Sequence, residues 1–329
     1  MDIKQISIKD IDNSLVGNMR YLRCSVRFLD AVMDSIGKVG LINPVIVQKT
    51  ENRNKLYSTV CGYQRVRAFK ELGIERIDAR IVDRVTDEEL LFISFYDNVF
   101  SRGFNDIEKA VILRNFLEIG YAKDRLLSEI IPLLGIPQNK NILDKYLSLF
   151  KLGGEIVDSL AKQEFEIEKA FLLIPLAKEE RDSVYKVLFK ESKTNINEAK
   201  ETVRNLLDLK KIKQCGIPEL LEGREIRGIL QGKNTNKRQK GESIYRFIKS
   251  LRYPSIHQKE EGFALSIKEL ALNSNVRINH SRFFEKDEVQ ITLKVTDEQN
   301  LESDLNKLLT HVRAGSFKKI FQKRVRRVN

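Results

Sequence analysis

The chain has 329 residues, of which 42% are hydrophobic, and a formal net charge of +12 at pH 7. This length allows two or three domains with packed cores, and the apolar content excludes a globally disordered chain. The positive charge favours a polyanionic partner.

Cysteine and histidine are scarce and dispersed. Cys24, Cys61 and Cys215 stand far apart, and the chain has three histidines. This spacing argues against a zinc cluster and a disulfide framework. The first residues lack the apolar core of a signal peptide, and no long uncharged apolar run follows. We therefore expect a cytoplasmic protein with no membrane partner.

The first hundred residues alternate between predicted strands and helices. Ile6, Ile8 and Ile11 indicate an edge strand or a docking segment. Residues 28–40 show helical spacing and end at a glycine, which predicts a helix. The apolar runs that predict strands cover residues 44–47, 56–61 and 79–82.

A predicted strand passes into a predicted helix at Gly62. Val66, Phe69 and Leu72 share one face of that helix, while Arg65 and its basic neighbours lie mostly outside it. The first amides of a helix lack internal partners, so an anion such as phosphate can bind there with help from arginine. The alternative is an ordinary basic, solvated helix face.

The next predicted helix begins near Thr86 and ends at a polar pair, Asp97-Asn98. An acid beside an amide can hold a hydrated magnesium ion, which takes one or two carboxylates together with phosphate oxygens. The alternative is an ordinary polar helix end.

From Asn105 the pattern is helical for about a hundred residues. Residues 126–150 form a short helix, a turn at Gly135 and a second helix, which is a helix-turn-helix pattern. Amides and lysines on the outer face of the second helix suit the major groove of DNA. The predicted DNA-contacting residues are Gln138, Asn139, Lys140, Asn141, Lys145 and Ser148. The alternative is a plain helical hairpin, and Pro132 and Asp144 weigh toward it.

The remaining sequence predicts three further parts. A helical bundle extends to residue 208, with Asn195 or Asn197 capping a helix. Residues 209–241 form a basic linker, because the segment 231–241 is polar and almost free of apolar side chains. Residues 242–329 combine two strands, 276–280 and 289–295, with helices and a basic tail. We expect this last part to dimerise.

Three boxes resemble those of the ParB partition-protein family. Residues 62–68, GYQRVRA, resemble the family's GERRxRA box. Residues 40–47, GLINPVIV, resemble its GLxQPIxV strand, and residues 97–110 match ENxQRxxLNPxEEA in length. The resemblance covers roughly residues 1–208. A basic box that the family carries near its N-terminus is only weakly matched, by Arg23 and Arg27.

The resemblance implies a sulfiredoxin-like fold that binds CTP and Mg²⁺ and acts as a switch. The implied nucleotide-binding residues are Gly62, Tyr63, Gln64, Arg65, Arg67 and Asn98, with Asp97 and Asn98 as magnesium ligands. Tyr63 and Gln64 replace a family glutamate and arginine, and Asp97 replaces a glutamate. Phe100 and Ser101 replace a glutamine and an arginine, with Arg102 displaced by one step. We therefore expect nucleotide binding to survive better than hydrolysis.

Two functions follow from these features. The first is a DNA-binding partition protein, dimeric, with a CTP-dependent clamp switch, weak CTP hydrolysis and a ParA-type partner ATPase. The second is a nucleotide-independent transcriptional regulator that retains the fold. A nuclease has little support, because no acidic metal-binding cluster stands out. The expected class is α+β, with a nucleotide-binding domain (1–104), a helical domain (105–208), a linker (209–241) and a C-terminal domain (242–329).

Overall fold

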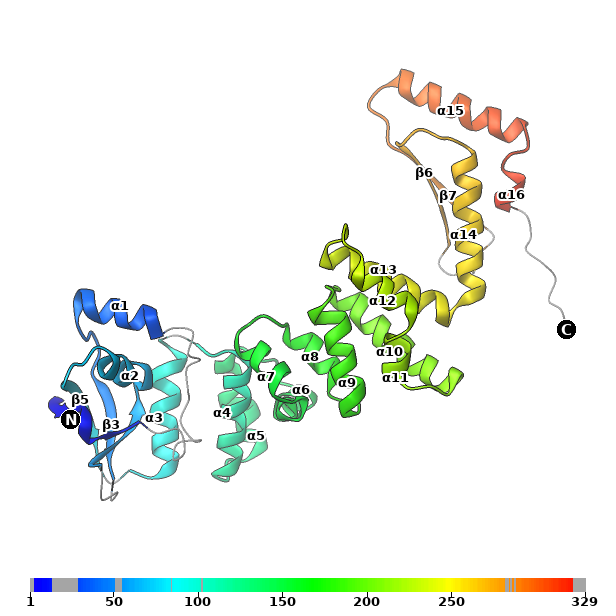
Figure 1. Ribbon diagram of the computed structural model, residues 1–329. Helices are drawn as coiled ribbons and strands as arrows, with labels where there is room; N and C mark the ends of the chain where they lie inside the picture. Colours follow the sequence, from blue (N-terminus) through cyan, green and yellow to red (C-terminus); the bar gives the residue numbers. More distant parts are fainter. Residues whose placement is uncertain are drawn as a thin grey trace. The chain divides into compact units, whose positions relative to one another are not determined.

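The computed structural model describes residues 3–13, 29–50, 55–83, 85–101, 103–281, 284, 286 and 288–321 (Figure 1). The chain divides into two compact units, Met1–Lys190 and Glu191–Asn329, and each is described by itself. Both units combine a sheet with helices, so the expected α+β class is confirmed. Within the described part, every helix is too short or too polar to span a lipid bilayer.

A five-stranded mixed sheet opens the first unit. Its strands are β1 (Ile3–Ser7), β2 (Ile11–Asp12), β3 (Val45–Lys49), β4 (Tyr57–Cys61) and β5 (Arg76–Val82), in the order β1-β5-β3-β4-β2. A 3₁₀ turn, η1 (Ile8–Asp10), joins the first two. Central β3 runs parallel to β5 and antiparallel to β4, and its Val45 and Val47 are fully buried in one core cluster. Because β1 and β2 are the two edges, the expected edge strand is confirmed.

Three helices accompany this sheet: α1 (Leu29–Val39), α2 (Tyr63–Glu71) and α3 (Asp87–Val99). α1 ends before Gly40, whose φ of +76° favours glycine. Val66 and Phe69 of α2 are buried in the core as expected. Leu72 was expected there too, but it is 39% exposed, because α2 ends at Glu71 and Leu72 lies at its C-cap.

The rest of the first unit is helical, as the sequence predicts. Its α-helices are α4 (Asp106–Glu118), α5 (Lys123–Arg125), α6 (Lys140–Leu147), α7 (Gly154–Ala161), α8 (Ile167–Leu173) and α9 (Lys178–Val184). Shorter turns are η3 (Leu126–Ile130), η4 (Pro132–Leu134), η5 (Leu149–Leu152) and η6 (Tyr185–Lys190). Asn105 starts α4, because its side chain accepts the Glu108 amide while the Glu108 carboxylate accepts the Asn105 amide.

The segment before α6 is an irregular helix, and Pro132 explains why. Proline has no amide hydrogen, and its ring disturbs the preceding helical turn. The chain therefore passes from α5 into a π-helical turn, η3, where the Ile131 amide donates to the Leu126 carbonyl at 3.0 Å. A 3₁₀ turn, η4, follows and stops at Gly135, whose φ is +65°. A helix, a turn at this glycine and a second helix thus occupy the predicted place.

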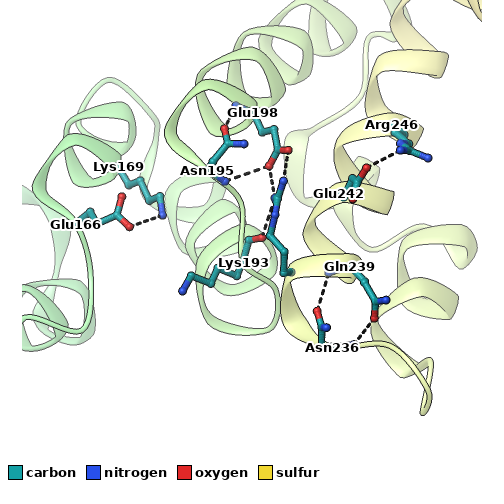
Figure 2. Close-up of polar contacts among 10 residues, drawn as sticks. Glu166, Lys169, Lys193, Asn195, Glu198, Asn236, Gln239, Glu242 and Arg246 are labelled. Atoms are coloured by element: carbon teal, nitrogen blue, oxygen red, sulfur yellow. Dashed lines mark hydrogen bonds and ion pairs between the residues drawn. The ribbon is translucent and has the colours of Figure 1, made fainter. Parts of the chain in front are cut away.

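The second unit begins with four helices: α10 (Ile196–Lys213), α11 (Ile217–Leu221), α12 (Arg224–Gln231) and α13 (Lys237–Arg252). Asn195, rather than Asn197, caps α10 by exchanging two hydrogen bonds with Glu198 (Figure 2). The prediction of a linker over residues 209–241 is wrong. This segment holds the end of α10, all of α11 and α12 and the start of α13, because Ile217, Leu221 and Ile226 supply enough buried surface.

Helices α10 and α13 pack side by side and run in the same direction. Arg238 forms an ion pair with Glu198 near the start of both helices (Figure 2). Farther along, the Tyr245 hydroxyl donates to Glu201 at 2.9 Å, and Arg252 Nε lies 3.0 Å from Asp208 Oδ2. Acidic side chains of α10 thus meet donors of α13 in sequence order.

An α+β part completes the second unit. It contains α14 (Pro254–Glu269), β6 (Val276–His280), β7 (Val289–Leu293), α15 (Glu298–Arg313) and α16 (Lys318–Phe321). β6 and β7 pair antiparallel, close to the predicted strand limits. Phe263, Ile278 and Leu308 lie in their shared core. The buried Asp304 carboxylate accepts hydrogen bonds from the side-chain amides of Asn273 and Asn275, which fix the turn after α14.

Several sequence expectations lie outside the described residues. They concern Cys24, the weakly matched basic box at Arg23 and Arg27, the displaced Arg102, and the basic side chains Lys323, Arg324, Arg326 and Arg327 of the tail.

Candidate nucleotide-binding and DNA-binding sites

Gly62 forms the turn between β4 and α2, where the sequence predicts an anion site. Its φ of +92° lies in the left-handed region, which is unfavourable for any residue that has a Cβ. A Cβ at this position would lie 2.8 Å from Val45 Cγ1 and 3.0 Å from Arg65 Nε. The turn therefore requires glycine for both its backbone and its packing. No side chain caps α2, and its first turn holds no acidic residue.

Arg65 connects three segments around this turn. Its Nη1 donates to the Asn43 carbonyl at 2.7 Å and to the Pro44 carbonyl at 3.0 Å. Its Nη2 lies 3.8 Å from Asp97 Oδ2 on α3, with both side chains partly exposed. One guanidinium thus joins the loop before β3, the start of α2 and the end of α3. The Arg65 guanidinium, which the sequence assigns to phosphate binding, thus already donates hydrogen bonds within the protein.

The Cys61 thiol lies beside this ion pair at the end of β4. Burial, together with the nearby Asp97 carboxylate, raises the pKa of Cys61 to about 12. Arg65 and a hydrogen bond with Ser94 act in the opposite direction. Cys61 is thus a buried thiol that stays protonated at neutral pH.

The side chains of Asp97 and Asn98 contact different protein partners. Asn98 Nδ2 donates to the Ser94 carbonyl one turn back at 2.8 Å, while Asp97 faces Arg65. In the described part of the chain, no three His, Cys, Asp or Glu side chains gather as metal ligands would. A magnesium ion here would have Asp97 as its carboxylate and would need phosphate oxygens and water for the rest of its octahedron.

The other implied nucleotide ligands differ in accessibility. Tyr63 and Arg67 are half-buried at the surface of α2, so both can reach a ligand. Gln64 is only 7% exposed, so its side chain faces the protein interior. The residues present therefore fit a phosphate-bearing ligand in part: the glycine turn, Tyr63, Arg65 and Arg67 suit it, and Gln64 does not.

The second candidate site is the outer face of α6. Leu143, Tyr146 and Leu149 are buried, and the Tyr146 hydroxyl donates to Asp106 Oδ1 at 3.0 Å. Burial and the adjacent Asp106 carboxylate raise the pKa of Tyr146, so this tyrosine remains a neutral donor that fixes α6 against α4. The exposed side chains on the opposite side are Gln138, Asn139, Lys140, Asn141 and Lys145.

Two of the predicted contact residues have structural roles at the ends of α6. Asn139 is the N-cap, and its side-chain oxygen accepts the Asn141 amide at 2.8 Å. That oxygen already accepts a hydrogen bond within the protein. Bidentate recognition of adenine uses both the oxygen and the nitrogen of an amide side chain. Ser148 lies at the C-cap and is half-buried. Asn141 and Lys145 remain the best placed for base contacts.

Ion pairs balance the negative charge of two carboxylates next to this face. Asp144 Oδ1 lies 3.7 Å from Lys123 Nζ, so the carboxylate that counted against phosphate binding has a cation beside it. Lys140 Nζ lies 3.2 Å from Asp124 Oδ1. Both pairs are largely exposed, so each contributes little to stability and can rearrange for a ligand.

Together these features define a mixed α+β module with a glycine turn, followed by a helical region with an exposed polar helix. Residues 1–99 match the model of the ParB N-terminal domain. This part of the chain is thus similar to a ParB-type N-terminal domain, as the sequence boxes predict.

Curated relatives include nucleoid occlusion proteins of two Bacillus species. The protein of Bacillus cereus (strain AH187) is 26% identical over 175 residues, 53% of this chain and 58% of the relative. The protein of Bacillus thuringiensis (strain Al Hakam) gives the same identity and the same shares. The match thus spans under two thirds of the length of these relatives.

Solved structures with a similar arrangement include the C-terminally truncated chromosome-partitioning protein ParB from Caulobacter crescentus complexed to the centromeric parS site. It is 17% identical, covers 61% of this chain and 98% of its own, and has a TM-score of 0.38. The same protein complexed with CTP-gamma-S is 18% identical, covers 54% and 94%, and has a TM-score of 0.28. The likeness at these scores extends to no detail of the site.

Sequence reasoning placed Gly62, Arg65 and Asp97 in one site, and the structure brings them together. It missed Cys61, whose thiol lies near the side chains of Asp97 and Ser94. It also missed the backbone carbonyls that hold Arg65. No local signal could have found those carbonyls, because they are more than twenty residues away in the chain.

Proposed function

We propose that this protein binds duplex DNA at specific sequences through α6 and acts in DNA segregation as a ParB-type partition protein. The observation that carries the proposal is the two-sided character of α6. One side is anchored in the core by Leu143 and Tyr146, while the other exposes Asn141 and Lys145. Amide and lysine side chains on a rigid helix suit base edges in the major groove.

Replacing Asn141 and Lys145 together tests the assignment of the recognition helix. We expect Asn141→Ala/Lys145→Ala to lose sequence preference and to keep weaker, salt-sensitive binding, because phosphate contacts carry no sequence information. The measurement is selection of bound sequences from a random pool, followed by titration of the selected site. Lys178→Ala, at an exposed position of α9 outside the predicted contact residues, is a surface control. An unchanged preference in the double variant would reject α6.

Nucleotide binding is the finer part of the proposal. We propose a cytidine triphosphate at the Gly62 turn, with the open amides of α2 and the cations Arg65 and Arg67 receiving the phosphates. Asp97 would face the magnesium ion. Binding would loosen Arg65 from the Asn43 and Pro44 carbonyls, so the loop before β3 would respond to the ligand. This response is the expected basis of a switch.

One observation favours the alternative, a nucleotide-independent DNA-binding regulator. The polar groups around the turn already satisfy one another: Arg65 binds two carbonyls and Asp97, and Asn98 binds Ser94. Calorimetry with CTP and magnesium on the wild type and on Arg65→Ala separates the two functions. Heat with the wild type and none with Arg65→Ala supports the switch. No heat with the wild type, with and without DNA, supports the regulator.

We propose a second copy of the chain as the partner of the C-terminal α+β part. Leu305, Leu309 and Val312 recur at spacings of four and three along α15 and are 43–56% exposed. Ile291 and Val295 are exposed at and just beyond β7. Apolar side chains at such spacing are typical of a helix face that packs against a partner, and symmetric DNA sites favour a two-fold protein.

The structure changes where the chain should be cut to test dimerisation. Truncation at Gly241 would divide α13, so the stop belongs after Arg252, where that helix ends. We expect the full chain to be a dimer by light scattering and the chain ending at Arg252 to be a monomer. A full-length monomer at high concentration would contradict the proposal, and so would a dimeric truncated chain.

A further inference from the structure

The positive charge of the protein is concentrated in one of its two units. Residues 1–190 hold 29 Lys and Arg against 28 Asp and Glu, a net charge of +1. Residues 191–329 hold 29 against 18, a net charge of +11. The candidate recognition helix α6 lies in the nearly neutral unit. Most of the charge that would attract a polyanion therefore belongs to the second unit.

Part of this charge forms a line on the outer face of α10. Lys200, Arg204 and Lys211 are exposed, and they are spaced by four and seven residues. At about 100° per residue, the three side chains point within about 40° of one another. At about 1.5 Å per residue, they cover about 16 Å of the helix. We call these three residues the α10 basic stripe.

The acids that could neutralise this stripe are directed elsewhere. Glu201 and Asp208 stand three residues before and four after Arg204, which are the positions of helical ion pairs. Glu201 instead accepts the Tyr245 hydroxyl, and Asp208 pairs with Arg252. Packing of α13 thus holds the acidic side chains of α10 on one flank and leaves the basic side chains on another.

The arrangement is unfavourable for α10 in isolation. Lys200 and Arg204 are like charges at four-residue spacing, which is unfavourable for a helix. Gln or Glu at either position would make a more stable helix of equal propensity. The core gains nothing from these exposed side chains, so their charge is available to solvent or to a ligand outside the helix.

We propose that the α10 basic stripe is a second DNA-contacting surface, which binds the phosphate backbone of duplex DNA without reading its sequence. This inference rests on the proposed DNA binding and adds a site outside α6. Charge complementarity identifies the occupant, because a duplex presents closely spaced phosphates along a length that exceeds the stripe. In this arrangement α6 supplies sequence preference and α10 supplies affinity and salt dependence.

The test is Lys200→Gln/Arg204→Gln/Lys211→Gln in the full chain, compared with Lys268→Gln/Lys294→Gln/Arg313→Gln. The control removes the same charge from exposed positions that are dispersed over α14, the end of β7 and α15. Glutamine preserves helix propensity, and circular dichroism checks that both variants fold. The measurement is the affinity for a mixed-sequence duplex and for the selected site at several salt concentrations.

Each phosphate contact contributes about 0.9 to the slope of log K against log salt. We expect the stripe variant to lose about two to three units of slope. Its loss of affinity between 50 and 200 mM salt would then be about 40-fold smaller than that of the wild type. We also expect its sequence preference to be unchanged and the control slope to move by less than one unit.

Three results would overturn the inference. They are an unchanged slope in the stripe variant, an equal change in the control, and a loss seen with single-stranded RNA but not with duplex DNA. In the first two cases a wild type that still selects a sequence leaves the proposed function intact. A wild type that binds no duplex DNA removes the proposed function as well.

Discussion

Gly241 lies where α13 crosses the segment that leads into α10. A Cβ built on this glycine would lie 2.6 Å from the Lys193 carbonyl carbon and 3.2 Å from Thr194 Cγ2, and it would contact the Lys193 carbonyl oxygen. The same segment holds α13 by a hydrogen bond from the Lys193 amide to the Lys237 carbonyl at 2.8 Å. Gly241→Ala therefore forces the backbone of α13 away from the backbone at Lys193, and no side-chain rotation can relieve this clash.

Two opposing effects determine the magnitude. Alanine is the better helix former by about 0.5–1 kcal/mol, whereas overpacking of a close contact costs about 1–3 kcal/mol. We expect Gly241→Ala to lower the free energy of unfolding by about 1–2 kcal/mol. Gly228→Ala in α12 is the matched control, because nothing lies within 4 Å of its added Cβ. That control should raise the free energy of unfolding by about 0.5–1 kcal/mol.

Urea unfolding of the full chain, followed by circular dichroism, measures both variants. Their midpoints should move in opposite directions from the wild type while the slope stays the same. If Gly241→Ala is as stable as Gly228→Ala, then α13 does not approach residue 193 this closely. The parallel pairing of α10 with α13 would then need revision.

Three other predictions concern the first unit and the start of α10. Gly62→Ala should cost about 1–2 kcal/mol for the left-handed backbone alone and more for the contact with Val45, which thermal unfolding would detect. The pKa of Cys61 rises on folding from 9.0 to about 12, so the folded state holds this proton more tightly. The resulting stabilisation is complete below about pH 9 and is lost as the pH rises toward 12. Wild-type stability should therefore fall more steeply above pH 9 than that of Cys61→Ala, and parallel curves would contradict the burial of the thiol. Asn195→Ala should lower the free energy of unfolding by about 1 kcal/mol, because it removes the cap of α10. Asn197→Ala should change it by less than 0.5 kcal/mol, and equal effects would show that the cap is misplaced.

Local sequence patterns were sufficient to predict the elements that begin or end at a glycine or a capping residue. The turn from β4 into α2 was predictable because β-branched residues end at a glycine and helical spacing begins. Asn195 was one of two predicted caps, and it is the one that an acid follows by three residues. These signals depend on residues close together in the chain, which is why they could be read without a structure.

The segment 209–241 was misjudged for a physical reason. Its composition is polar and basic, as in a linker, but a few apolar residues at helical spacing suffice when other helices cover them. Ile226 of α12 is fully buried, and so is Ile244 of α13. Burial of this kind depends on tertiary contacts, which a reading of local composition cannot include.

The candidate site was partly predictable for the same reason. The order of the boxes placed Gly62 and Asp97 in one module, but the partners of each side chain depend on how strands and helices meet. Arg65 binds carbonyls from the loop before β3, and Gln64 faces inward although its neighbours face outward. Helical periodicity alone does not distinguish such neighbours.

The parallel course of α10 and α13 has a consequence for how the chain folds during synthesis. Two parallel helices need a return path, here provided by α11 and α12, so α10 emerges well before the helix that covers it. Until α13 is made, the buried surface of α10 remains exposed together with polar Thr202 and Asn205. The nascent second unit should therefore be most prone to aggregation and proteolysis in that interval, and chains that stop before α13 should behave in the same way.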